Sequence, residues 1–130
     1  MTTIKAYTDL EQSKKLAEIL PLESADIHIG NYVGKSGKVD GTNVHYYFKG
    51  ESFGAPEIID AWSLAALLDV LPRSIEFKGD KYYIRFMKEY VEYANDEISI
   101  TGRCLHTTGN HNLVDACYEM ILKLHELNLL

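Results

Sequence analysis

The segment from Ala61 to Pro72 constrains the fold more than any other part of this 130-residue chain. It is almost entirely apolar and contains the only tryptophan of the sequence, Trp62. Ser63 is a suitable helix N-cap, leucines follow it at helical spacing, and Pro72 prevents the helix from continuing. A helix this short and apolar is stable only when other elements cover it. We therefore predict a core helix between Ser63 and Pro72, with Trp62 fixing its start to a sheet.

Two further helices are predicted from their caps. Thr8 and Glu11 fit a capping box, which predicts a helix from about Asp9 to Leu20 that Pro21 ends. Asn112 can cap a last helix, in which apolar residues recur on one side. That apolar stripe consists of Leu113, Cys117, Met120, Ile121, Leu124 and Leu127.

Alternating and β-branched segments predict the strands. They are Ile27–Ile29, Asn43–Lys49, Ser74–Lys78, Tyr82–Met87, Tyr90–Ala94 and Ile98–Thr101. Glycines at Gly30 to Thr42 predict a loop or the tip of a long hairpin, and Gly79-Asp80 predicts a tight turn. Gly50 to Pro56 and Gly102 to His111 are predicted loops. Together the elements predict an α+β fold, with one mostly antiparallel sheet of about five strands and three helices packed on one face. A chain of this length is typical of a single domain, residues 1–130.

Charge and composition limit the classes of function. The chain has 19 acidic and 13 basic side chains and a net charge of −6, and it offers no basic patch for direct binding of nucleic acid. The two cysteines do not form a disulfide framework. The first residues do not resemble a signal peptide, and no apolar run is long enough for a membrane span. We therefore expect a cytoplasmic protein that contacts neither membrane nor nucleic acid.

The motifs of the sequence assign no catalytic, cofactor-binding or metal-binding residue. The loop from Gly30 to Ser36 resembles a phosphate-binding loop, but its glycines are too close together and no helix can follow. Cys104, His106 and His111 could contribute to a zinc site or to a nucleophile and base. Their spacing is not specific for either, so solvated loop residues are the preferred interpretation, and no cofactor is expected.

Aromatic residues cluster on the predicted strands. Alternate residues of a strand point to opposite faces, so one set enters the core and the other lies on the outer face of the sheet. Exposed tyrosines and phenylalanines suit a protein interface, although lysine and glutamate stems can also shield them. The interaction candidates are Tyr46, Phe48, Tyr83, Tyr90 and Tyr93.

Several segments, in order, carry a resemblance to a known family. They are Glu11 to Leu20, Glu23 to Asp26, Ala61 to Leu68 with Leu71-Pro72, Tyr82 to Ile84, and Leu113 to Cys117 with Glu119 to Ile121. Over most of its length, except Gly30 to Phe53, the chain resembles a family of small uncharacterised proteins. These are encoded by gut Bacteroides-type bacteria and by their phages or mobile elements. The resemblance implies a cytoplasmic accessory protein and transfers no catalytic residue, because the family has no assigned activity.

Three functions are compatible with these patterns. The first is a non-enzymatic interaction or accessory module of a phage or mobile element. Its partner is either another protein or a second copy of the chain, which would form a homodimer. The second is a small enzyme or ligand-binding protein with a polar pocket near Cys104, His106 and His111. The third is an acidic decoy that binds a host nucleic-acid-binding protein, which predicts a continuous acidic surface.

Overall fold

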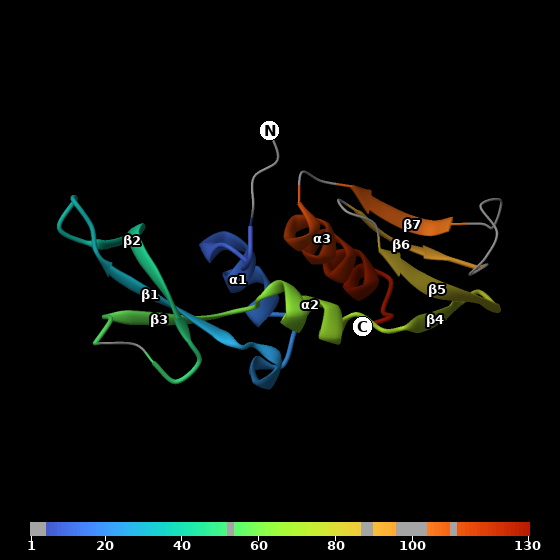
Figure 1. Ribbon diagram of the computed structural model, residues 1–130, viewed down its shortest axis with the longest axis horizontal. Coiled ribbons are helices and arrows are strands. Elements are labelled where there is room, and N and C mark those ends of the chain that lie inside the picture. The colour runs from blue at the N-terminus through green and yellow to red at the C-terminus, as the bar shows by residue number, and fades with distance from the viewer. Residues whose placement is uncertain (1–4, 52–53, 87–89, 96–103, 110–111) are drawn as a thin grey trace. The chain divides into compact units, whose positions relative to one another are not determined.

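A computed structural model describes residues 5–51, 54–86, 90–95, 104–109 and 112–130, the side chains of 104–109 excepted. The chain divides into two compact units, residues 7–66 and residues 67–130 with the N-terminal residues 5 and 6 (Figure 1). Both combine helices with antiparallel strands, which confirms the predicted α+β class. The described strands form two sheets, one in each unit, so a single sheet of about five strands is not confirmed. Whether the units fold as one domain stays a prediction.

The unit of residues 7–66 contains a three-stranded antiparallel sheet. Its elements are α1 (Leu10–Ala17), a 3₁₀ turn (Leu22–Ser24), β1 (Ile27–Val33), β2 (Val39–Phe48) and β3 (Glu57–Ala61). The strand order is β2-β1-β3, so β1 is central. The predicted hairpin tip is confirmed, although β1 and β2 both extend further into the glycine-rich segment than expected. β3 was not predicted, and its pairing with β1 completes this sheet without any strand of the other unit.

The cap of α1 lies one residue later than predicted. Asp9, not Thr8, caps the helix, and its carboxylate accepts the Gln12 amide at 2.8 Å while Gln12 bonds back to the Asp9 amide. Thr8 is not available as a cap, because its hydroxyl lies 2.7 Å from the Ser13 hydroxyl and accepts the Trp62 amide at 3.1 Å. A tertiary contact thus displaces a local capping motif.

The core of this unit forms between α1 and the sheet. Ile27, Ile29 and Ala61 are buried, and Leu10 of α1 packs against them. Trp62 is fully buried, and its indole N–H donates to the Ser24 hydroxyl at 2.9 Å. The tryptophan is therefore a structural residue.

A bulge interrupts the pairing of β1 with β2. Tyr32 pairs with Asn43 but Val33 pairs with Val39, so residues 40–42 of β2 have no opposite residue on β1. Gly41 adopts a φ of 84°, in the left-handed region that favours glycine. The buried Asn31 amide holds the bulge, because its oxygen accepts the Gly41 amide at 3.2 Å and its nitrogen donates to Glu57 at 3.1 Å.

The predicted core helix is α2 (Leu64–Val70). Ser63 caps it as predicted, since its hydroxyl accepts the Ala66 amide at 3.2 Å, and Ser63 itself donates to Asp26. Leu67 is fully buried. The boundary between the two units falls within this helix, after Ala66.

The second unit pairs four strands in sequence order. Its elements are β4 (Ser74–Phe77), β5 (Asp80–Phe86), β6 (Tyr90–Ala94), β7 (Cys104–Gly109) and α3 (Leu113–Glu126). α3 lies along one face of this sheet (Figure 1). Asn112 caps α3 as predicted, accepting the Asp115 amide at 2.8 Å. The buried side of α3 contains Val114, Ala116, Cys117, Met120, Ile121 and Leu124.

A turn and a strand of this unit differ from the sequence predictions. The tight turn lies at Lys78-Gly79, one residue earlier than predicted, and both residues have positive φ. Residues 104–109 form a strand where a loop was predicted, because pairing with β6 supplies order that local composition does not indicate. The predicted strand Ile98–Thr101 lies outside the described residues.

Candidate interaction surface

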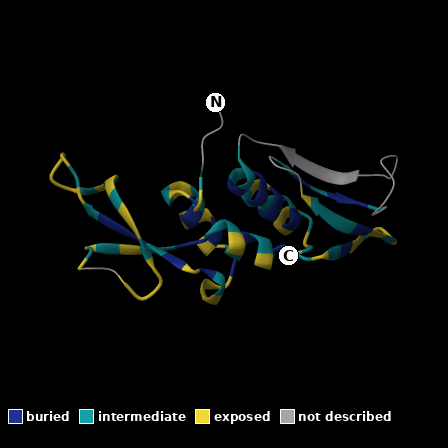
Figure 2. Cartoon of the chain, viewed as in Figure 1, coloured by how far each residue is buried: buried dark blue, intermediate teal, exposed yellow. Residues whose placement is uncertain are grey.

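Among the strands whose side chains are described, β2 is the one without a buried residue. It lies at one edge of its sheet with β1 as its only paired neighbour among the described strands, and none of its ten residues is buried (Figure 2). By contrast, four of the seven residues of β1 are buried. A strand in this position has one row of backbone donors and acceptors directed away from the sheet.

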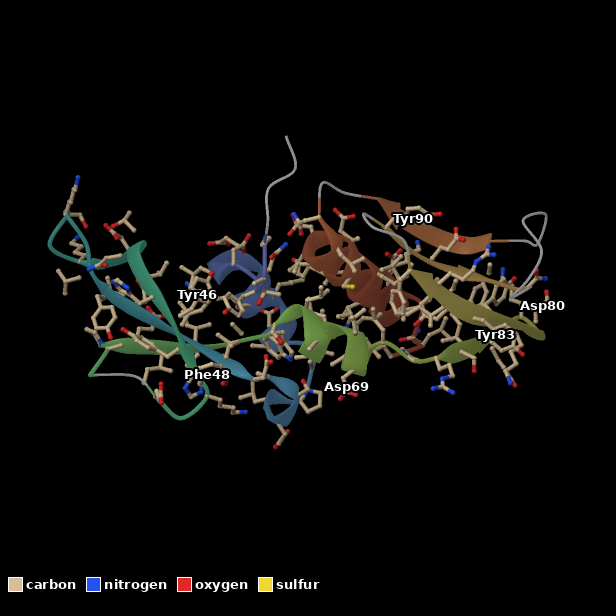
Figure 3. All side chains as sticks on the ribbon, viewed as in Figure 1. Tyr46, Phe48, Asp69, Asp80, Tyr83 and Tyr90 are labelled. Carbon is tan, nitrogen blue, oxygen red and sulfur yellow. The ribbon has the colours of Figure 1, made fainter. Side chains whose placement is uncertain are left out.

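Tyr46 and Phe48 share one face of β2. They pair with Ile29 and Ile27, whose side chains are buried on the side that α1 covers. At this end the face is open, since Phe48 is 75% and Tyr46 38% exposed (Figure 3). These two sequence-predicted candidates are therefore close together and accessible.

Tyr7 extends this aromatic surface from a different segment. Its ring stacks on Tyr46 with centroids 5.2 Å apart and planes 21° apart. The segment is fixed because Thr8 exchanges hydrogen bonds with Trp62, and because the Tyr46 hydroxyl donates to the Thr8 carbonyl at 3.2 Å. We call Tyr7, Tyr46 and Phe48, with the outer edge of β2, the aromatic edge. No sequence signal indicated Tyr7, because its stacking depends on the tertiary fold.

A shallow hollow of about 230 Å³ lies at the aromatic edge. Its lining consists of Tyr7, Ile27, Tyr46, Tyr47, Phe48 and Glu51. Glu51 is the one charged residue among the described residues of this lining. The described part of the site therefore combines exposed aromatic rings with a carboxylate and contains no lysine or arginine.

The opposite face of the sheet is occupied by its own polar contacts. The hydroxyls of Tyr32 and Tyr47 lie 2.8 Å apart, and this hydrogen bond raises the pKa of Tyr32. The two rings lie so close to Gly30 that a Cβ there would be within about 3 Å of both. His28 accepts the Gly50 amide through Nδ1, so Nε2 carries the proton that it shares with Asp60 at 3.1 Å. These groups stabilise one another across the strands.

The glycine-rich hairpin tip is also internally bonded. Ser36 and Thr42 donate their hydroxyls to the Asp40 carboxylate, which lowers the pKa of Asp40 to about 2. Gly34 leaves room for this arrangement, because a Cβ there would overlap the Thr42 hydroxyl and the carboxylate. A hollow of about 700 Å³ adjoins the tip. The segment is a bulged hairpin and no helix begins after it, unlike a phosphate-binding loop.

The three candidates of the second unit differ from one another. Tyr93 is fully buried, donates to the Pro72 carbonyl at 2.6 Å, and has a raised pKa because of burial, so it belongs to the core. Tyr83 and Tyr90, labelled in Figure 3, are half-buried, and the register of β5 with β6 places them on the sheet face opposite Tyr93. Lys81 extends over the Tyr83 ring at 5.5 Å, as expected where lysine stems shield a sheet.

The predicted pocket near Cys104, His106 and His111 involves side chains outside the described part of the chain, and it stays a prediction. Among the described residues, no group of three or more His, Cys, Asp or Glu side chains could hold a metal ion. Cys117 is buried in α3, and burial raises the pKa of its thiol to about 12. A thiol held in its protonated form is a poor nucleophile.

Comparisons with protein-family models, curated proteins and solved structures find no match to this chain. No helix within the described ranges is both long and apolar enough to cross a membrane. The family resemblance of the sequence therefore remains a prediction.

Proposed function

We propose that this chain is a non-enzymatic protein-interaction module that binds its partner through the aromatic edge. The supporting observation is the combination at one place of an edge strand without buried residues and three exposed aromatic rings. Tyrosine and phenylalanine provide large contact area at low entropic cost, because few torsions must be fixed on binding. A strand edge adds backbone hydrogen bonds to that area.

The size of the hollow favours a protein partner over a small molecule. Its volume of about 230 Å³ lies below that of ordinary ligand pockets, which is roughly 300 to 1,000 Å³. Phe48 would remain largely exposed beside any molecule small enough to enter. A polypeptide can cover both the ring and the strand edge.

The biological setting proposed for this module comes from the sequence alone. The resemblance to proteins of gut Bacteroides-type bacteria, their phages and mobile elements favours a cytoplasmic accessory role. An enzymatic role has no comparable support, and one pair of titratable groups in this unit, His28 with Asp60, makes a contact between strands.

Site-specific photo-crosslinking tests the proposed surface. A benzophenone amino acid replaces Phe48, which is 75% exposed, in one variant and Phe86, a 44% exposed phenylalanine of the other unit, in a control. In cells that encode the protein, the variant at position 48 should yield a discrete cross-linked protein that the control lacks. Equal labelling at both positions, or none at position 48, would contradict the proposal.

A further inference from the structure

We propose that the occupant of the aromatic edge is an extended basic peptide segment, which adds to β2 as a further strand and places a lysine or arginine side chain over Tyr46 and Phe48. This inference rests on the proposed function and specifies the chemistry of the partner. It follows from the backbone of β2, the lining of the hollow and the charge of the unit.

The backbone of β2 is suited to strand addition. Natural edge strands are commonly protected from pairing by charged residues or prolines. β2 has neither between Gly41 and Phe48, although β-branched and aromatic residues favour an extended strand there. The residues from Asn43 to Phe48 pair regularly with β1, which holds this stretch in the extended conformation that an added strand requires.

The side chains of the aromatic edge favour a positively charged side chain on the added strand. An added strand directs every second side chain to the face that carries Tyr46 and Phe48. A side chain on that face reaches the hollow, whose lining is aromatic except for Ile27 and Glu51. Ammonium and guanidinium groups bind favourably over aromatic rings, and the Glu51 carboxylate complements their charge.

The charge of the unit favours the same partner. Residues 7–66 contain nine acidic and five basic side chains, a net charge of −4. Lys49, which follows Phe48 in the sequence, directs its ammonium to the Leu22 carbonyl at 2.7 Å. A basic segment is attracted to this unit, whereas a second copy carries the same negative charge.

Blocked pentapeptides provide a direct test with the full chain. The probes are acetyl-Thr-Val-Xaa-Val-Thr-amide, with lysine, arginine, norleucine or glutamate as Xaa, titrated into ¹⁵N-labelled protein and followed by NMR. Norleucine retains the aliphatic stem of lysine without its charge. We expect the lysine and arginine peptides to bind about five-fold or more tightly than the norleucine peptide, with shifts centred on Tyr7, Tyr46 and Phe48. Added salt should reduce this preference.

A matched pair of variants distinguishes the contribution of the aromatic ring to peptide binding from that of apolar surface area. Phe48→Leu keeps an apolar side chain but removes the aromatic ring. It should therefore weaken the binding of the lysine peptide and leave the affinity for the norleucine peptide unchanged. Phe86→Leu, in the other unit, should change neither.

The outcomes distinguish this inference from the proposed function. Equal affinity for the lysine and norleucine peptides at the aromatic edge would refute the preference for a basic side chain. The proposal that the aromatic edge is an interaction surface would still stand. Absence of peptide binding together with a concentration-dependent dimer in sedimentation, abolished by Phe48→Leu, would identify a second copy as the occupant and overturn this inference. Absence of peptide binding without such a dimer would also overturn it, whereas the cross-link at position 48 tests the surface independently.

Discussion

Tyr93 of the second sheet and the pair Tyr46 and Phe48 of the first lie in opposite environments. In the second unit, Tyr93 of β6 is fully buried and packs on the side of the sheet that faces Cys117 of α3. In the first unit, Tyr46 and Phe48 of β2 remain exposed, while the core is provided by β1, α1 and Trp62. Burial of apolar area stabilises a fold, whereas exposed aromatic area is available for binding. The comparison therefore separates residues that maintain the structure from those proposed to carry the function.

The largest expected effect is the loss of a buried aromatic residue from either unit. Trp62→Ala and Tyr93→Ala should each lower the free energy of unfolding by about 3 to 5 kcal/mol, because each leaves a cavity in a fully buried site. Urea titrations followed by far-UV circular dichroism measure this, since Trp62→Ala removes the only tryptophan fluorescence.

Hydrogen exchange on the same variants tests the predicted single domain. If the chain unfolds as one domain, either substitution lowers amide protection in β1 and in α3 together. Loss confined to the unit that carries the substitution would show that the two units unfold independently.

Asn31→Ala should give an intermediate effect. The substitution removes the buried acceptor of the Gly41 amide and should cost about 1 to 3 kcal/mol. Asn43→Ala is the matched control, because Asn43 is exposed and bonds to the Val33 carbonyl at the surface. Urea midpoints that shift equally for both variants would refute the assigned role of Asn31.

Asp40→Asn should produce a smaller effect that depends on pH. The pKa of Asp40 is lowered from 3.8 to about 2 in the folded chain, so its ionised form stabilises the fold above about pH 4. That contribution is lost as the pH falls toward 2. The stability difference between wild type and Asp40→Asn should therefore shrink over this range, measured by thermal unfolding at several pH values. A difference that stays constant with pH would rule out the carboxylate as its source.

Phe48→Ala should have the smallest effect on stability. The side chain is 75% exposed, so the free energy of unfolding should change by less than about 0.5 kcal/mol. The melting temperature measured by calorimetry should match that of the wild type. A marked loss of stability would show that Phe48 supports the fold, and this would weaken the contrast between the two sheets.

Local signals predicted the elements whose ends are set by local contacts. Asn112 and Ser63 cap their helices as predicted, because each satisfies amides within its own first turn. Predictions failed where a distant residue changes the local preference. Thr8 is engaged by Trp62 and Ser13, so the cap moves to Asp9.

Long-range pairing explains the other differences. β3 begins at Glu57 and contains Asp60, so its composition did not indicate a strand, yet it completes the first sheet by pairing with β1. Of the predicted interaction residues, Tyr46 and Phe48 are exposed but Tyr93 is not. Alternation along a strand separates two faces and does not indicate which face a helix covers.

The bulge at residues 40–42 has a further consequence for binding. If β2 accepts an added strand, regular pairing is available only from Asn43 to Phe48, a length of about 20 Å. A longer partner segment would gain no additional backbone bonds beyond the bulge. The bulge would thus limit the length of the paired segment, so that the partner is recognised through a short linear motif and the complex stays reversible.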